Sequence, residues 1–151
     1  MGKRKLFTPP TAHEDGSHIK CAPTVMMAVT GKTPEQVYRS IANAGVNTKW
    51  VRTRGMYMHE ITQSFNHMGY KTSRVSINHL YEDGKAPTMA KWLRERRGNE
   101  LHNTYLLYTH DHVMLVSGNQ FVDTASNGIV HVDSAPRRRS RIICVHELRG
   151  K

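Results

Sequence analysis

The pattern of apolar and polar positions changes character about two-thirds of the way along the chain. Up to residue 98 the apolar residues recur mostly at helical spacing. Beyond residue 104 they form short runs rich in valine, isoleucine and tyrosine, which are separated by turn residues. Helices followed by an antiparallel meander predict an α+β fold in which N-terminal helices pack on a C-terminal antiparallel β-sheet. We expect an irregular N-terminal arm over residues 1–20 and a single domain over residues 21–151, because Pro9-Pro10 blocks regular structure in the arm.

The first part of the chain predicts four helices. One opens at Cys21 in CAPTVMMAVTG, because Pro23 fits only in the first turn of a helix and a glycine follows the apolar run. The second begins after Thr33, which forms a capping-box signature with Gln36, and it ends at Gly45. A basic loop over 46–55 precedes a third helix over 56–69. A short strand over 71–77 and a turn-rich connection then lead to a fourth helix over 87–98.

The last third of the chain predicts a meander of short strands. These cover residues 104–109, 112–117, 120–125, 129–134 and 141–148. Gly118-Asn119 predicts a tight hairpin turn between the second and third of them. In the alternating run HVMLV, Val113 and Leu115 should share one face, with His112 on the other face.

Charge is the strongest compositional signal. The chain has 22 Lys and Arg against 12 Asp and Glu, a net charge of +10, which predicts attraction to nucleic acid, anionic surfaces or an acidic protein. The basic residues are dispersed over 3–5, 91–97 and 137–141 and do not alternate with aromatic residues in the way typical of a base-stacking platform, so we interpret them mainly as solvated surface. No apolar run is long enough to span a membrane and the N-terminus has no apolar stretch typical of a secretory signal, which favours a cytoplasmic location.

The two cysteines have no CxxC partner, which argues against metal and redox roles. We expect Cys144, inside RIICVHEL, to be a buried thiol on a strand. His131 and Asp133 alternate on one strand without a nearby nucleophile, so we interpret them as surface residues. No four-ligand zinc spacing is present, and we expect neither a metal nor a cofactor. Residues whose spacing is loosely compatible with metal ligation are His13, His18, Cys21, His110 and His112.

The order of Cys21, His112 and Asp123 gives the chain its best candidate chemistry. A thiol at a helix N-terminus has a lowered pKa, and the free N–H groups there can hold an oxyanion. His112 at the mouth of an apolar strand suits a general base, and Asp123 after the Gly118-Asn119 turn should lie near it and orient its ring. Asn119 is a competing orienter, but its place in the turn disfavours it.

The stretches CAPTVMMAVTGKTPEQVYRSIANAG and HVMLVSGNQFVDT resemble papain-like cysteine peptidases, and most of all compact bacterial and phage forms similar to the bacteriocin-leader-processing peptidases. The resemblance implies a papain-like fold, with Cys21 as nucleophile, His112 as base and Asp123 as orienter, and for a phage protein a location in the host cytoplasm. The chain departs from the family at Ala22, where glycine is commoner. It also departs in having no Gln or Asn among residues 1–20, where the family places an oxyanion donor. Of Ser17, His18 and Lys20, we take His18 as the candidate donor.

Two functions follow as hypotheses. The first is a cysteine hydrolase, a peptidase or isopeptidase that acts on a peptide or protein through a thioester, with acyl transfer left open. The second is a peptidase-like binding module of little or no activity, whose basic surface binds nucleic acid or an acidic protein. The +10 charge and the missing oxyanion glutamine motivate the second hypothesis.

Overall fold

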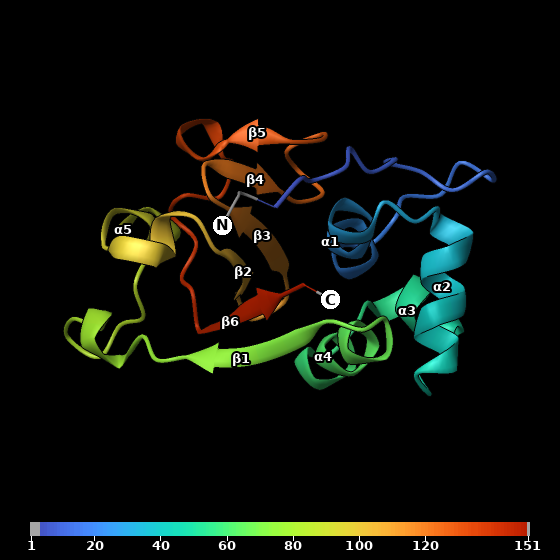
Figure 1. Ribbon diagram of the computed structural model, residues 1–151, viewed down its shortest axis with the longest axis horizontal. Coiled ribbons are helices and arrows are strands. Elements are labelled where there is room, and N and C mark those ends of the chain that lie inside the picture. Colours follow the sequence, from blue (N-terminus) through green and yellow to red (C-terminus); the bar gives the residue numbers. More distant parts are fainter. Residues whose placement is uncertain (1–3, 151) are drawn as a thin grey trace.

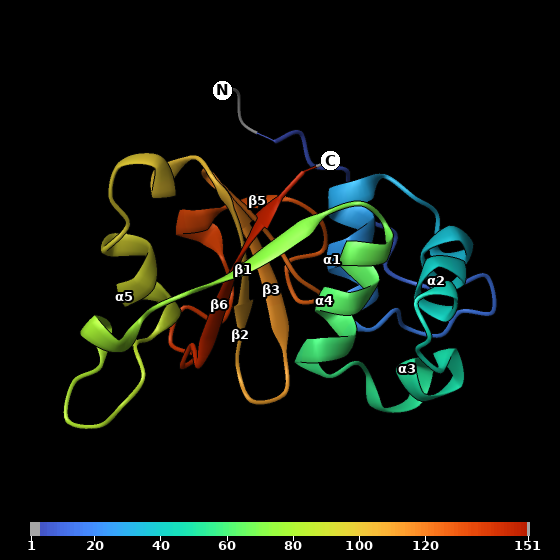
Figure 2. The same ribbon diagram turned by 60° about the horizontal axis from the view of Figure 1, so that its bottom comes forward.

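The computed structural model describes residues 4–150 and has three layers (Figures 1 and 2). A sheet lies in the middle, with helices α1 to α4 on one face and α5 on the other. The helices are α1 (Cys21–Thr30), α2 (Pro34–Asn43), α3 (Thr48–Arg54), α4 (Met58–His67) and α5 (Met89–Arg94), with short 3-10 turns at Asn78–Leu80, Gly98–Leu101 and Val132–Ser134. The predicted α+β class is therefore confirmed. No helix in the described part of the chain is long and apolar enough to cross a bilayer.

The sheet is antiparallel and has six strands within the described residues, in the order β1-β6-β2-β3-β4-β5. Their bounds are β1 (Lys71–Val75), β2 (Thr104–Tyr108), β3 (Val113–Ser117), β4 (Gln120–Val122), β5 (Val130–His131) and β6 (Cys144–Arg149). The meander prediction holds for β2 to β5. It is wrong for β6, which turns back and pairs with β1 on one side and β2 on the other.

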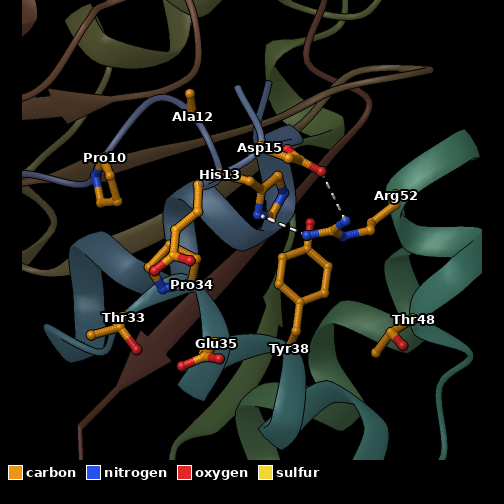
Figure 3. A pocket seen from close by; sticks show the side chains of 11 residues that line it. Pro10, Ala12, His13, Asp15, Thr33, Pro34, Glu35, Tyr38, Thr48 and Arg52 are labelled. Atoms are coloured by element: carbon orange, nitrogen blue, oxygen red, sulfur yellow. Dashed lines mark hydrogen bonds and ion pairs between the residues drawn. The ribbon is translucent and has the colours of Figure 1, made fainter. Parts of the chain in front are cut away.

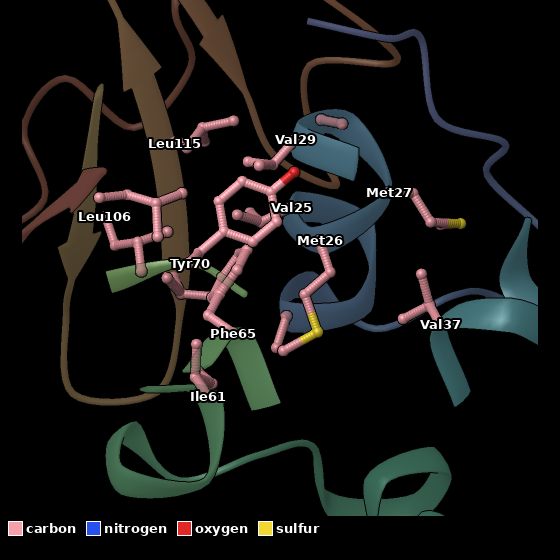
Figure 4. Close-up of a cluster of buried hydrophobic side chains, with 14 of the residues drawn as sticks. Val25, Met26, Met27, Val29, Val37, Ile61, Phe65, Tyr70, Leu106 and Leu115 are labelled. Carbon is pink, nitrogen blue, oxygen red and sulfur yellow. The ribbon is translucent and has the colours of Figure 1, made fainter. Parts of the chain in front are cut away.

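Helix α1 lies at the centre of the larger core because it is apolar on every side. Eight consecutive residues, Ala22 to Val29, are buried, which is typical of a helix enclosed by other elements. Figure 4 shows Met26 of α1, Phe65 of α4 and Leu106 of β2 in one cluster, with Tyr70 beside Phe65. The rings of Phe65 and Tyr70 meet edge to face, with centroids 5.9 Å apart. This packing fixes α1 against the sheet, and α1 carries Cys21.

A smaller core covers the opposite face of the sheet. Met89, Trp92 and Leu93 of α5 pack there against residues of β2, β3 and β6. Arg96, which we expected on the solvated surface, is only 7% exposed. Its guanidinium donates to the carbonyl of Gly118 at 2.8 Å and lies over the ring of Trp92. This arginine therefore ties the end of α5 to the β3–β4 turn.

Several predicted elements differ in extent from the structure. The strands expected over 120–125 and 129–134, for example, are confined to Gln120–Val122 and Val130–His131. The basic loop expected over 46–55 contains α3, whose first turn is capped by Asn47 through a hydrogen bond from Lys49 N at 3.0 Å. The helix expected over 87–98 ends at Arg94, and the strand expected over 141–148 begins only at Cys144. Residues 95–97 therefore lie outside the helix and residues 141–143 lie outside the strand, although the local sequence pattern suggested regular structure there.

Over residues 4–20 the N-terminal arm has no helix or extended strand, and it packs closely on the rest of the chain. Leu6 and Ile19 are buried within the larger core. Phe7 N donates to the carbonyl of Ala28 in α1 at 2.9 Å. The arm therefore forms part of the folded unit and borders the functional site described next.

Candidate active site

Cys21, His112 and Asp123 come together at one end of the sheet because each lies at the end of a regular element. Cys21 is the first residue of α1. His112 is the last residue of the four-residue connection between β2 and β3, which is closed by a hydrogen bond from Thr109 N to His112 O at 2.9 Å. Asp123 follows directly after β4, which forms the predicted hairpin with β3. The ends of these helices and strands therefore position the three side chains, and the register of the sheet fixes the spacing between them.

The face predicted for His112 is wrong. The alternation of HVMLV placed this residue with Met114 and Val116, whose side chains pack in the smaller core with α5. The pleat begins only at Val113, however, and His112 contacts Cys21, which packs with the larger core. A residue outside the strand is free of the strand's alternation, so the histidine reaches the thiol.

The carboxylate of Asp123 is fully buried and accepts four hydrogen bonds. Oδ1 accepts from the backbone N–H groups of Ala125 and Ser126 at 2.8 and 2.9 Å, an arrangement that Asp favours at the start of a turn. Oδ2 accepts from His112 Nε2 at 3.0 Å and from Arg137 Nε at 3.2 Å. The backbone thus fixes one oxygen and leaves the other to orient the imidazole.

Hydrogen bonding decides the charge of His112. Burial by itself lowers the pKa of this imidazole, whose side chain is 9% exposed. Hydrogen bonds to Asp123 and Cys21 outweigh burial and raise the pKa to about 9, although the nearby charge of Arg137 opposes them. Because Nε2 faces Asp123, Nδ1 is the ring nitrogen that faces the thiol. His112 is therefore protonated at neutral pH.

The thiol of Cys21 has the complementary shift. Burial raises the pKa of this thiol, but the hydrogen bond and positive charge of His112 lower it further than burial raises it. The backbone N–H groups of Val113 and Ala22 also point to the sulfur and favour its thiolate form. Cys21 and His112 therefore favour a thiolate–imidazolium pair, which is the reactive form of such a thiol.

A second cysteine–histidine pair in the same protein shows what the carboxylate contributes. Cys144 is buried, as predicted, and its sulfur lies 3.5 Å from His146 Nε2. Here burial raises the pKa of the thiol and lowers the pKa of the imidazole, so both groups are neutral. His146 Nδ1 is buried, and no group in the described part of the chain accepts a hydrogen bond from it. A cysteine beside a histidine is thus not enough to form a thiolate–imidazolium pair. The hydrogen bond between His112 and Asp123 distinguishes the first pair from the second.

Two cavities meet at Cys21 and His112. One, of about 500 Å³, is bordered by the arm at Pro9 and Pro10, and by Asp123. The other, of about 610 Å³, has an apolar lining that includes Met58, Tyr108 and Ile143. Arg54, Met56 and Asp111 line both cavities together with the thiol and the imidazole. The sulfur therefore lies where an extended ligand would pass from one cavity into the other.

His18, the predicted oxyanion donor, is exposed and lines the 500 Å³ cavity together with Cys21. Its backbone forms an isolated bridge with Ala12, which holds this part of the arm in a turn. The hydroxyl of Thr24, on the same side of α1, already donates to the carbonyl of Lys20 at 2.8 Å. His18 thus lies in the right cavity, and its role as donor stays a prediction.

Figure 3 shows a third cavity, of about 680 Å³, where the arm crosses α2 and α3. The ring of His13 lies 5.2 Å from that of Tyr38, and Arg52 donates to His13 Nδ1 at 3.1 Å. Arg52 also approaches Asp15 at 3.8 Å. Burial and the charge of Arg52 lower the pKa of His13, so this imidazole is neutral when the arm is docked.

Sequence reasoning missed two arrangements of basic residues beside the site. Arg137 reaches the buried carboxylate of Asp123, although its run was interpreted as solvated surface. Arg54 lies between the rings of Trp50 and Tyr57, at 5.2 and 4.2 Å from their centroids, and Glu60 holds its guanidinium through two contacts of 3.1 Å. Trp50 and Tyr57 are 58% and 59% exposed, so aromatic and basic groups do alternate on this surface. The spacing of Trp50, Arg54 and Tyr57 in the sequence was the available signal.

Comparison of the chain with models of known protein families, with curated proteins and with solved structures gave no match. Within residues 4–150, no group of three or more His, Cys, Asp or Glu side chains is placed to hold a metal ion. The predicted surface pair His131 and Asp133 is exposed, with 3.5 Å between Nδ1 and Oδ2. The arrangement at Cys21 is thus the chemical feature on which a function must be argued.

Proposed function

We propose that this protein is a papain-like cysteine hydrolase, a peptidase or isopeptidase that uses Cys21, His112 and Asp123. The observation that carries the proposal is the placement of the Cys21 thiol against His112, whose Nε2 lies 3.0 Å from the buried Asp123 carboxylate. The opposite pKa shifts of Cys21 and His112 support a preformed nucleophile and proton donor. The Cys144–His146 pair is neutral, so it offers neither a preformed nucleophile nor a proton donor.

The reaction begins when the Cys21 thiolate attacks the carbonyl carbon of an amide. A carbon–sulfur bond forms, and the carbonyl electron pair moves to the oxygen. The first-turn N–H groups of α1 have no acceptor within the helix, and they would stabilise that oxyanion, with His18 as the second donor. When the tetrahedral intermediate collapses, the carbon–nitrogen bond breaks and the amine leaves with the proton of His112.

Water completes the cycle. Neutral His112 takes a proton from water as the oxygen attacks the thioester, and the carbon–sulfur bond then breaks. The carboxylic acid leaves, and the thiolate–imidazolium pair is restored. An amine or alcohol in place of this water would give acyl transfer at the same site. Asp123 keeps Nδ1 of His112 directed at the sulfur in every step.

The two cavities on either side of Cys21 favour a chain-like substrate over a small metabolite. A peptide whose scissile bond lies at Cys21 would place neighbouring segments in both cavities at once. The lining by Met56, Met58 and Ile143 favours an apolar side chain in the larger of the two. Peptide or protein is therefore the substrate class that we propose.

A peptide library with mass-spectrometric detection of new termini tests the proposal. We expect the wild-type chain and Cys144→Ala to cleave the same bonds, and Cys21→Ala to cleave none. Circular dichroism should show that all three chains are folded. Equal cleavage by the Cys21→Ala variant would refute the proposal, because it would place the chemistry elsewhere.

A second candidate function is binding of single-stranded nucleic acid at the stack of Trp50, Arg54 and Tyr57. Exposed rings that alternate with a guanidinium favour stacking of bases, and the net charge of +10 favours attraction to the backbone. Titration of a fluorescent oligonucleotide should show an affinity that falls steeply with salt and is reduced in Trp50→Ala. An affinity that is negligible at low salt would exclude this function.

A further inference from the structure

Arg137 reaches the candidate triad from a segment that contributes nothing else to it. The residue lies in the turn between the 3-10 turn at Val132–Ser134 and β6. Its Nε donates to Asp123 Oδ2 at 3.2 Å, and this oxygen also accepts from His112 Nε2 at 3.0 Å. The imidazole and the guanidinium therefore share one carboxylate oxygen.

The residue that makes this contact has a strained backbone. Its φ is 66°, in the left-handed region that disfavours most side chains. The other non-glycine residues with positive φ are Asp83 and Asn127 within the described part of the chain, and these residue types tolerate that region. Glycine would relieve the strain at position 137, so the presence of arginine there needs a reason.

We propose that Arg137 is a positioning residue of the triad, which holds Asp123 Oδ2 and limits how strongly this carboxylate stabilises protonated His112. The catalytic meaning of this inference rests on the hydrolase proposed above. Since Oδ1 is fixed by two backbone N–H groups, Oδ2 alone is divided between His112 and Arg137. The side chain of Arg137 is 40% exposed, so the contact is open to solvent on one side.

The electrostatic consequence is a more acidic imidazolium. The positive charge of Arg137 lowers the pKa of His112, against the contacts with Asp123 and Cys21 that raise it. If the pKa of His112 were too high, the imidazolium would transfer its proton slowly and the leaving amine would be released more slowly. Arg137 thus keeps the proton of His112 transferable while Asp123 keeps the ring in place.

Other charged groups surround His112 and stay the same in the variants below. The ring is in contact with Cys21 and Asp123, and the guanidinium of Arg137 lies behind the carboxylate. The further titratable and basic side chains that share its two cavities are His18, Lys20, Arg54, Tyr57, His59, Tyr108, His110 and Asp111. A shift that follows Arg137 alone is therefore attributable to this contact.

Titration of His112 by NMR in the full chain tests the inference, because it requires neither a substrate nor turnover. Arg137→Gly fits the backbone conformation and removes the charge, and we expect the pKa of His112 to rise by about 0.5 to 1 unit. Arg137→Lys keeps the charge and should return the pKa toward the wild-type value. Arg139→Gly, which removes an exposed arginine two positions away, serves as the control and should leave the titration unchanged.

A second readout is the pH profile of Cys21 alkylation by iodoacetamide. The pH range over which the thiolate–imidazolium pair exists should extend to higher pH in Arg137→Gly, with no fall in the thermal midpoint, since glycine relieves the strain. If Arg137→Gly fails to fold, Arg137→Gln takes its place in both measurements. If the pKa of His112 in Arg137→Gly equals that of the wild type or is lower, the inference is overturned. If the pKa rises as expected but the wild-type chain cleaves no peptide, only the proposed hydrolase function is overturned.

Discussion

Replacement of Asp123 by asparagine should disable the site while it changes a single atom. Oδ1 of the carboxylate accepts two backbone hydrogen bonds, from Ala125 and Ser126, and only an oxygen can take over that position. The amide nitrogen would then occupy the place of Oδ2 and point its protons at His112 Nε2 and at the N–H of Arg137. The imidazole would have to carry its proton on Nδ1 only, and the imidazolium would lose its acceptor.

The size of the effect follows from the charge state of His112. A pKa raised from 6.5 to about 9 corresponds to about 3 kcal/mol in favour of the imidazolium, and its side chain is 9% exposed, so solvent screens this little. Asp123 and Cys21 share that stabilisation. We therefore expect Asp123→Asn to lower the pKa of His112 by about 1 to 2 units. The ratio of the thiolate–imidazolium pair to the neutral thiol–imidazole pair should fall by about 10- to 100-fold with it, and the thiolate fraction of Cys21 at pH 6 should fall as a result.

The assay is the second-order rate of Cys21 alkylation between pH 5 and 10, with labelled residues identified by mass spectrometry. Asp133→Asn is the matched control, because this carboxylate also faces a histidine but is exposed. We expect the control to follow the wild-type profile and Asp123→Asn to react well only above about pH 8, as an ordinary thiol does. An unchanged profile in a folded Asp123→Asn variant would refute the reasoning, because the carboxylate would then have no part in activating the thiol.

Three further predictions concern stability and the arm. The pKa of folded His13 lies below its ordinary value of 6.5, so docking of the arm is fully favourable above pH 6.5 and weakens as the pH falls toward the lowered pKa. Hydrogen exchange over residues 10–18, corrected for intrinsic rates, should therefore accelerate over that pH range in the wild type but not in His13→Asn. Phe65→Ala should lower the free energy of unfolding by about 3 to 5 kcal/mol in urea titrations, because the ring is fully buried, whereas Phe7→Ala should cost about 1 kcal/mol or less; equal losses would contradict the packing described. Arg96→Ala should cost about 1 to 3 kcal/mol through the lost hydrogen bond to a buried carbonyl, measured against Arg94→Ala on the exposed side of α5, and a negligible difference would contradict this role.

The sequence predicted those parts of the fold whose signals are local. The capping box at Thr33 and the Gly118-Asn119 turn both occur in the structure, because their hydrogen bonds join residues only a few positions apart. The proximity of His112 and Asp123 follows from the same hairpin. The place of β6 was not predictable in this way, since its pairing with β1 joins residues 70 to 78 positions apart and neither segment encodes the other's register.

The proximity of the three candidate residues was predictable, but their surroundings were less so. Residue types and element ends pointed to Cys21, His112 and Asp123, because helix and strand termini have recognisable sequence signals. Arg137 was missed because its contact with Asp123 depends on a left-handed backbone conformation and joins two loops 14 positions apart. Helix α3 was missed because we interpreted its run of basic residues as a loop and did not recognise Asn47 as a helix cap. Tertiary contacts between loops have no local pattern that reveals them.

The central position of β6 has a consequence for synthesis on the ribosome. Every residue of β2 is buried, and its edge is paired by β6, which emerges about 35 residues later. Until then the nascent chain presents an apolar strand with unpaired backbone groups, which is the kind of edge that recruits other strands. We therefore expect chains that stop before residue 144 to aggregate rather than to fold into a smaller domain, and we expect folding in the cell to depend on protection of β2 during that interval.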